Sequence, residues 1–363
     1  MAAIESGVIM LPAPGFGNVC AMLPHIDRRG FLVSLPALMM TPSVIAQAGN
    51  SPIKIRSLNH VELIVSDLKR SVDFYQGLFG MPVQGRTGST GVLLRVGSGP
   101  QHLVLSSADA GAMPKIDHYG LSIESFNVDR LVKTLGEHGV TRSDQRGPMK
   151  VQVSRRGADV LQVYVGDPDG IVFQLQDVSY CGGTGALGNI CAQTESSPAK
   201  GLIALKGYSH CTIFIADAQR SNAFYRQLFG MSFRSYQGPT APTLAVGPGV
   251  EFLMFAGGAG RAGANGAPPR PVSINHFCFT LDGFKPDLIL KALESFGIKP
   301  RESQTGPVGP MRSYVSMRME DRGGAKEGTP ELYFTDPDGI LLQLQDVSYC
   351  GGSGFLGNVC PAI

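Results

Sequence analysis

The chain has 363 residues, of which 43% are apolar and 17% charged, so it is long enough to bury cores for about two domains. Its formal charge is only +2, and no run of Lys and Arg exceeds two residues, which leaves no electrostatic basis for binding nucleic acid or an anionic membrane surface. We therefore expect a globular protein that binds a small molecule, as a monomer or a homodimer.

Residues 1–48 have the features of an export signal. Arg28 and Arg29 precede an apolar run that reaches Ile45, and residues 46–48 form an A-x-A cleavage pattern. The run is about a dozen residues long, too short to span a bilayer as a helix. It resembles a twin-arginine signal, which predicts a mature chain that starts near Gly49, folds before export and lies in the periplasm without a membrane span. The alternative is a buried N-terminal helix.

The cysteines include two pairs with the same spacing. Cys181 and Cys191 are ten positions apart, and so are Cys350 and Cys360. In an oxidising compartment this spacing favours two local disulfide bonds, each closing a glycine-rich loop. A thiolate metal site is the alternative, although neither loop contains His or a second close pair of cysteines.

An internal repeat organises the rest of the chain. The pattern RSxxFYxxLFGM occupies residues 70–81 and recurs at residues 220–231, an offset of 150. The tetrad Asp-Pro-Asp-Gly also occurs twice, at residues 167–170 and 336–339. Each tetrad is a turn followed by an apolar strand with one polar residue inside it, Gln174 or Gln343.

Each copy of the repeat divides again into two similar units. Residues 58–63 alternate as a half-buried strand, and residues 67–79 have the apolar spacing of a helix. Short strands follow, and the same order restarts at Ile116. Four units of one strand, one helix and three strands result. They predict one domain at residues 52–193, a linker at 194–200 and a second domain at 201–363.

These motifs resemble the vicinal-oxygen-chelate superfamily, which includes glyoxalase I, bleomycin- and fosfomycin-resistance proteins and type I extradiol dioxygenases. The shared marks are a His in the opening strand, the FYxxLFGM helix and the DPDG strand. The resemblance covers nearly the whole predicted mature chain twice. It implies an α+β fold in which four βαβββ modules pair into two glyoxalase-like domains that enclose metal or ligand sites. It is less informative about activity, because one fold hosts many chemistries.

Four histidines occupy equivalent places, each opening a module behind one apolar and one small polar residue. A lone His in a strand is usually a core residue, but four at equivalent positions favour a shared role. The resemblance implies that they are metal ligands, with the third ligand of each set four residues after the DPDG glycine. The two implied sets are His60, His118 and Gln174, and His210, His276 and Gln343.

Extradiol dioxygenases use two His and one Glu, a set that suits Fe(II) with open positions for oxygen and substrate. This chain has Gln where the carboxylate is expected. An amide oxygen still coordinates, but it binds a divalent ion more weakly than an anion. We expect a divalent metal, Fe(II) first, with Zn, Mn, Ni or Cu as alternatives, and binding without metal remains open.

Other polar residues near the expected ligands complete the hypothesis. Glu62 is two residues from His60, on the same strand face, and is a candidate for the missing carboxylate ligand of the first domain or for a general base. Tyr164 and Tyr333 precede the DPDG turns and resemble the extradiol tyrosine that hydrogen-bonds substrate or oxygen. Packing beside the turn is the alternative. We assign neither His102 nor His138 to the site.

The repeated tails are not part of the family pattern. Both read DVSYCGGxGxLGNxC, at residues 177–191 and 346–360, and they predict either a lid over the site or packing between domain ends.

The resemblance favours an exported metal-dependent oxygenase acting on a small aromatic or phenolic compound. Two alternatives are a glyoxalase-like lyase or isomerase, with metal polarising a carbonyl and Glu62 as base, and a non-catalytic ligand-binding protein of the resistance type.

Overall fold

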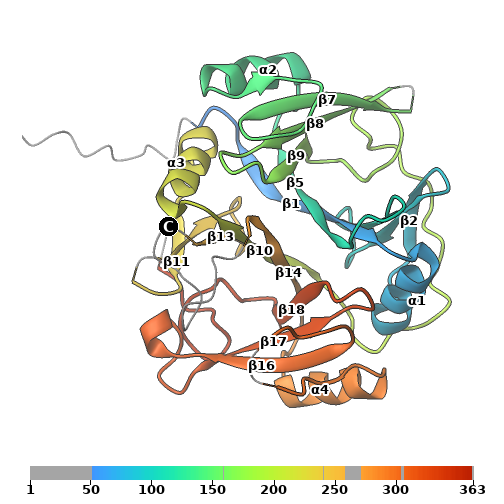
Figure 1. Ribbon diagram of the computed structural model, residues 1–363, viewed down its shortest axis with the longest axis vertical. Coiled ribbons are helices and arrows are strands. Elements are labelled where there is room, and N and C mark those ends of the chain that lie inside the picture. The colour runs from blue at the N-terminus through green and yellow to red at the C-terminus, as the bar shows by residue number, and fades with distance from the viewer. Residues whose placement is uncertain (1–50, 158, 240, 258–270, 304–305, 362–363) are drawn as a thin grey trace, which may run out of the picture. The chain divides into compact units, whose positions relative to one another are not determined.

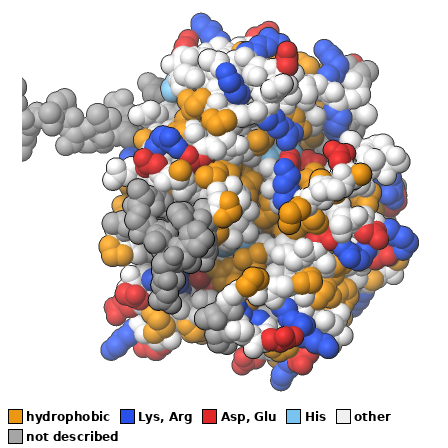
Figure 2. Space-filling view, in the orientation of Figure 1, with side chains coloured by type: hydrophobic (Ala, Val, Ile, Leu, Met, Phe, Trp, Pro, Cys, Tyr) orange, Lys and Arg blue, Asp and Glu red, His pale blue; other side chains and the backbone are white. Residues whose placement is uncertain are grey.

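The computed structural model describes residues 51–361, apart from residues 158, 240, 258–270 and 304–305. The predicted export signal lies outside the described residues. None of the helices in the described part of the chain has the length and hydropathy needed to cross a membrane. Acidic and basic side chains are interspersed on the face shown in Figure 2, in keeping with the small net charge.

The two halves of the chain form two nine-stranded sheets with the same strand order, β2-β3-β4-β1-β5-β9-β8-β7-β6 and β11-β12-β13-β10-β14-β18-β17-β16-β15 (Figure 1). The strands of the first sheet are β1 (Ile55–Val65), β2 (Val83–Thr87), β3 (Gly91–Arg95), β4 (His102–Ser107), β5 (Lys115–Ile123), β6 (Thr141–Arg142), β7 (Lys150–Arg156), β8 (Val160–Gly166) and β9 (Val172–Asp177). Those of the second are β10 (Gly207–Ile215), β11 (Phe233–Tyr236), β12 (Pro242–Ala245), β13 (Phe252–Gly257), β14 (Ser273–Leu281), β15 (Lys299–Pro300), β16 (Arg312–Arg318), β17 (Thr329–Thr335) and β18 (Leu341–Asp346). The predicted α+β fold of two repeated domains is confirmed.

The opening strands of the modules lie at the centre of each sheet. In the first sheet β1 pairs antiparallel with β5, and each has a parallel partner on its other side, β4 and β9. In the second sheet β10, β14, β13 and β18 repeat this arrangement. Residues that open the modules therefore lie side by side across the centre of each sheet.

Four helices accompany the sheets: α1 (Leu68–Phe79), α2 (Val128–Glu137), α3 (Ala218–Phe229) and α4 (Pro286–Ser295), with a short 3-10 turn η1 (Glu320–Arg322). Helix α1 begins at Asp67, whose side chain accepts from the Arg70 amide, and ends at Gly80, which has a φ of 68°. Helix α3 repeats both caps with Asp217 and Gly230. These caps explain the fixed Asp and Gly around the FYxxLFGM motif.

The DPDG turns join the two halves. In the first turn, Asp167 Oδ1 accepts from the amides of Asp169 and Ile171, which closes the turn, and Tyr225 Oη lies 3.5 Å from its Oδ2. Asp169 forms an ion pair with Arg220 of α3. The second turn makes the same contacts with α1. Tyr75 donates to Asp336 at 3.1 Å, and Arg70 forms an ion pair with Asp338.

Candidate metal centre

The first candidate site forms where three central strands of the first sheet meet. His60 on β1 lies opposite Gly120, Gly120 lies opposite Gln174 on β9, and His118 on β5 lies opposite Glu62. Alternation along the strands places the apolar neighbours Val61 and Leu63 in the core and the polar residues on the other face. The period-2 pattern of the opening strands thus determines which face carries the site.

The three expected residues of the first domain converge on one point. Nε2 of His60 and Nε2 of His118 lie 3.0 and 3.1 Å from Oε1 of Gln174, and 3.3 Å from each other. All three side chains are at most 2% exposed. We call this group the first triad.

The second domain contains an equivalent group, the second triad. Nε2 of His210 and Nε2 of His276 each lie 3.0 Å from Oε1 of Gln343. Burial lowers the pKa of His210 well below its usual value and that of His276 to about 4, so both rings are neutral near pH 7.

The other ring nitrogens of the first triad are held by acceptors. Nδ1 of His60 lies 2.8 Å from Oδ1 of Asn59, and Nδ1 of His118 lies 3.0 Å from Oδ2 of Asp117. Burial opposes ionisation of Asp117, but contacts with His118, Lys115 and Arg146 lower its pKa well below the usual range. A carboxylate behind a histidine orients the ring and raises its basicity as a ligand.

Neutral groups occupy these places in the second domain. Nδ1 of His210 lies 3.0 Å from Oγ of Ser209, and Nδ1 of His276 lies 2.7 Å from Oδ1 of Asn275. The two triads therefore have the same three inner residues and different outer partners.

Glu62 lies beside the first triad rather than inside it. Its Oε2 is 3.5 Å from Nδ1 of His118, on the side of the ring away from Gln174, and its Oε1 accepts a 2.6 Å hydrogen bond from Ser106. Glu62 is partly exposed, so a ligand on the polar face can reach it. Its carboxylate thus lies on the Nδ1 side of His118, opposite the Nε2 atom that faces Gln174.

Tyr164 and Tyr333 both lie edge-on to the second histidine of their triads, with ring centroids 5.2 Å from His118 and 5.3 Å from His276. Burial raises the pKa values of Tyr164 and Tyr333 well above their usual value, so both hydroxyls stay protonated. Tyr333 donates to Glu331 at 3.1 Å.

The sequence did not indicate the role of His102, which the fold brings to the first triad. Its ring stacks on His60 at 5.1 Å, and in the second domain Phe252 stacks on His210 at 4.4 Å. Burial lowers the pKa of His102 to about 4, and its Nε2 is buried without a hydrogen-bond partner in the described structure. The sequence did contain one signal for this pair, because His102 and Phe252 are 150 positions apart, the same offset as the two copies of the RSxxFYxxLFGM pattern. His138 instead caps α2 at Thr134, away from the triad.

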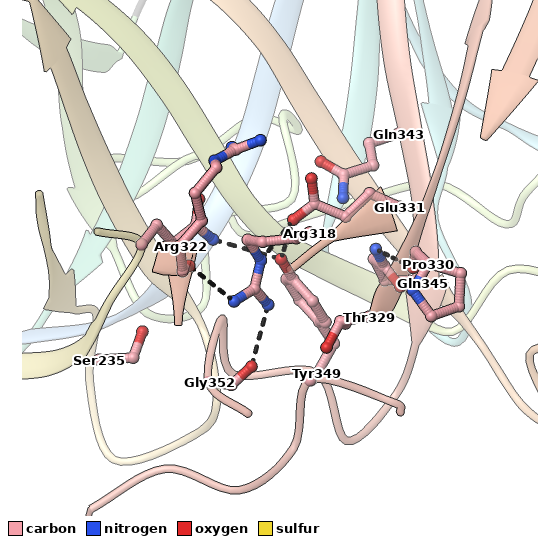
Figure 3. A network of polar contacts seen from close by, with 12 residues as sticks. Ser235, Arg318, Arg322, Thr329, Pro330, Glu331, Gln343, Gln345, Tyr349 and Gly352 are labelled. Carbon is pink, nitrogen blue, oxygen red and sulfur yellow. Dashed lines mark hydrogen bonds and ion pairs between the residues drawn. The ribbon is translucent and has the colours of Figure 1, made fainter. Parts of the chain in front are cut away.

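The second site also has a buried ion pair that sequence reasoning missed (Figure 3). Arg318 is fully buried, donates from Nε to Glu331 Oε1 at 2.8 Å, and donates from Nη2 to the Gly352 carbonyl at 2.9 Å. Tyr349 donates to the same carboxylate at 3.0 Å. Gln162 stands at the place of Glu331 in the first domain, so the first domain lacks this pair.

Both tails fold back onto their own domains. Tyr180 lies 6.0 Å from His60 between ring centroids and Tyr349 lies 5.7 Å from His210. Arg156 and Arg318 bind the tail carbonyls of Gly183 and Gly352. The predicted disulfides, Cys181–Cys191 and Cys350–Cys360, are confirmed and close these loops. The tails therefore form walls beside the triads.

The first triad suits a divalent cation. Asn59 Nδ2 donates to the Tyr180 carbonyl at 3.0 Å, so its Oδ1 faces His60 and accepts the Nδ1 proton. Asp117 likewise accepts the Nδ1 proton of His118. The lone pairs of the two Nε2 atoms and the Gln174 oxygen then face the same buried space. Two imidazoles and one oxygen donor are common ligands of first-row divalent metals.

A family model named Glyoxalase/Bleomycin resistance protein/Dioxygenase superfamily matches residues 57–175 and 207–344. The chain belongs to this superfamily. The predicted resemblance is thereby confirmed for both domains. No curated protein matches the sequence significantly.

Several solved structures have a fold similar to that of this chain and match most of its length, at low sequence identity. The 2,3-dioxygenase LapB from Pseudomonas sp. KL28 has a TM-score of 0.55 and 16% identity, over 85% of this chain and 94% of its own. An Mn(II)-bound glyoxalase from Novosphingobium aromaticivorans has a TM-score of 0.54 and 15% identity, over 80% and 82%. Homoprotocatechuate 2,3-dioxygenase from Brevibacterium fuscum, in complex with 3,4-dihydroxyphenylacetate, has a TM-score of 0.53 and 17% identity, over 81% and 82%. These similarities support the fold.

Proposed function

We propose that this protein is an exported, metal-dependent oxygenase that acts on a small aromatic or phenolic compound. The observation that carries the proposal is the convergence of His60, His118 and Gln174 within 3.3 Å of one another at a buried point. The fold shared with 2,3-dioxygenases supports the reaction class.

In this proposal His60, His118 and Gln174 hold a divalent ion, Fe(II) first, and His210, His276 and Gln343 are the equivalent candidates. The metal, when bound, would supply open positions where oxygen and the oxygens of the substrate bind side by side. The protein supplies orientation, because buried partners fix each imidazole. The Mn(II)-bound glyoxalase of similar fold makes Mn the next candidate metal.

Glu62 and Tyr164 are the groups that we propose act on the substrate. Glu62 is partly exposed on the polar face and close enough to His118 to receive a proton from a bound phenol. Tyr164 keeps its proton because burial raises its pKa well above the usual value, so it can donate a hydrogen bond to a substrate oxygen. Tyr333 has the same place in the second domain, although its hydroxyl is already bound to Glu331.

Export through a twin-arginine signal at residues 1–48 completes the proposal. Two disulfides in the folded chain support an oxidising compartment, and we propose the periplasm. Changing Arg28 and Arg29 together to Lys should retain the protein in the cytoplasm. Unchanged export would contradict the signal without bearing on the reaction.

The reaction is tested by oxygen uptake. Protein purified anaerobically and loaded with Fe(II) should consume oxygen with one or more members of a panel of catechols and phenols. The variant Glu62→Gln should lose most of this activity while it retains metal. Bound metal without oxygen uptake, but with turnover of a carbonyl substrate, would instead support a glyoxalase-like lyase or isomerase with Glu62 as base.

A further inference from the structure

The outer partners of the two triads differ in one chemical respect, whether they can donate a hydrogen. In the first domain, Asn59 is fixed by its bond to Tyr180 and Asp117 is a carboxylate, so both groups only accept. Each ring therefore carries its proton on Nδ1. Both Nε2 atoms are left with lone pairs that face the Gln174 oxygen.

The outer partners in the second domain can donate instead. Ser209 has a hydroxyl, which donates as readily as it accepts. Asn275 presents its Oδ1 to Nδ1 of His276, and its side chain has no second hydrogen bond to a described residue that fixes it, so the amide can turn and donate to Nδ1. Both rings can then carry the proton on Nε2 and donate to the two lone pairs of the Gln343 oxygen. The two ring Nε2 atoms and the Gln343 oxygen are then satisfied without a cation, while Nε2 of Gln343 is buried without a hydrogen-bond partner in the described structure.

The floor of the two sites differs as well. Gly120 lies beneath His60, and a Cβ at this position would be 2.2 Å from Cε1 of the imidazole. Cys278 carries that Cβ in the second domain, opposite both His210 and Gln343. The close approach of the His60 ring to the backbone of β5 therefore depends on a glycine that the second domain lacks.

The carboxylates beside the two triads, Glu62 and Glu331, also differ between the domains. Glu62 of the first domain is partly exposed and binds one neutral hydroxyl, that of Ser106. Glu331 of the second is 3% exposed and accepts from Arg318, Tyr349 and Tyr333. The negative charge of Glu331 is thus neutralised within the protein and is not available to a bound cation.

We propose that the first triad is a metal site and that the second triad is a metal-free group closed by hydrogen bonds to Gln343. The chain would then bind one divalent ion, in its N-terminal domain. This inference rests on the proposed function only in taking a divalent cation as the ligand.

Metal stoichiometry tests this inference directly. The full chain is stripped with a chelator and titrated anaerobically with Fe(II) and, separately, with Mn(II), and bound metal is measured after desalting. We expect one equivalent per chain. The variant His118→Ala should abolish binding and its matched partner His276→Ala should retain one equivalent. The unfolding midpoint of each variant is measured, and a variant that fails to fold is replaced by the corresponding His→Gln change.

A second pair of substitutions tests the outer partners themselves. The double variant Asn59→Ser/Asp117→Asn gives the first triad the surroundings of the second, and we expect its metal affinity to fall about 10–100-fold. Two equivalents per chain, binding that depends on His276 alone, or an unchanged affinity in the double variant would overturn the inference and leave the oxygenase proposal in place. The absence of metal binding at both triads would overturn both.

Discussion

At the scale of single residues, the unusual feature is Gln at the place of a carboxylate ligand. The amide keeps an oxygen that points at two imidazoles, 3.0 and 3.1 Å away in the first triad, but it brings no charge. The nearest negative charges are on Asp117 and Glu62, both on the Nδ1 side of His118. In the first site the negative charge therefore lies behind His118, on the Nδ1 side of the ring, and not on an atom that would bind the metal.

Restoring the carboxylate should strengthen the site. We expect Gln174→Glu to bind Fe(II) at least about tenfold more tightly, because an anion replaces a neutral donor. The control is Gln162→Glu, which adds the same charge on β8 at the place of Glu331 and should change affinity less. Isothermal titration of the stripped protein measures both, and equal effects of the two variants would argue against Gln174 as a ligand.

His102 should make the protein sensitive to acid. Its pKa is about 4 in the folded protein and about 6.5 in the unfolded chain, so the unfolded state takes up the proton first as the pH falls. The free energy of unfolding should therefore decrease by about 3 kcal/mol between pH 6.5 and 4 through this residue. His102→Phe, which copies Phe252, should make the pH dependence shallower by this amount in urea titrations, and His138→Gln should not. An identical slope in all three proteins would contradict the assignment.

At the scale of elements, the opening strands and DPDG strands could be predicted because their apolar alternation is regular and repeated. The position of strand β2 (Val83–Thr87) was not predicted, since its sequence VQGRT lacks that alternation and the strand is held by pairing with β3 and with Glu195 of the predicted linker. The tails left two interpretations open. Their contacts with Arg156 and Arg318 are long-range in sequence, and no local pattern indicated them.

The tails also connect to the triads in different ways. The Tyr180 carbonyl fixes Asn59, which fixes His60, whereas the second tail reaches its site through Arg318 and Glu331. Removing either disulfide should cost roughly 2–3 kcal/mol of stability. Cys181→Ser/Cys191→Ser should in addition weaken metal binding several-fold, while Cys350→Ser/Cys360→Ser should not. The two double variants are compared by unfolding and metal titration, and equal effects on metal would refute this coupling.

At the scale of the whole molecule, the repeat produces two halves that bind each other reciprocally. Each FYxxLFGM helix contacts the DPDG turn of the other half, and Tyr119 and Tyr225 meet at 2.7 Å between hydroxyls. Both motifs could be recognised in the sequence, and so could the equivalent places of the four histidines. The sequence could not predict that the motifs join the halves, because their partners lie more than 50 residues away. Nor did it reveal that the two triads differ in their outer partners, since only their contacts show which groups can donate.

Glu251 should give the contact between the halves a pH dependence. It accepts from Gln101 and from the amide of Leu58, and burial raises its pKa to about 8. A carboxyl group with a raised pKa stabilises the fold when protonated, so stability should fall as pH rises from about 4.5 to 8, by about 5 kcal/mol. Glu251→Gln should flatten this dependence, and Glu294→Gln on the exposed face of α4 should not. Unfolding curves at a series of pH values measure the difference, and a parallel dependence would contradict it.

Everything that we propose for the first domain depends on a divalent metal binding to the first triad. The most direct measurement is anomalous diffraction from crystals loaded with Mn(II), which locates the ion without reference to activity. We expect one strong peak among His60 Nε2, His118 Nε2 and Gln174 Oε1, and no peak at His210, His276 and Gln343. A peak in the second triad alone, or no peak in either, would contradict this expectation.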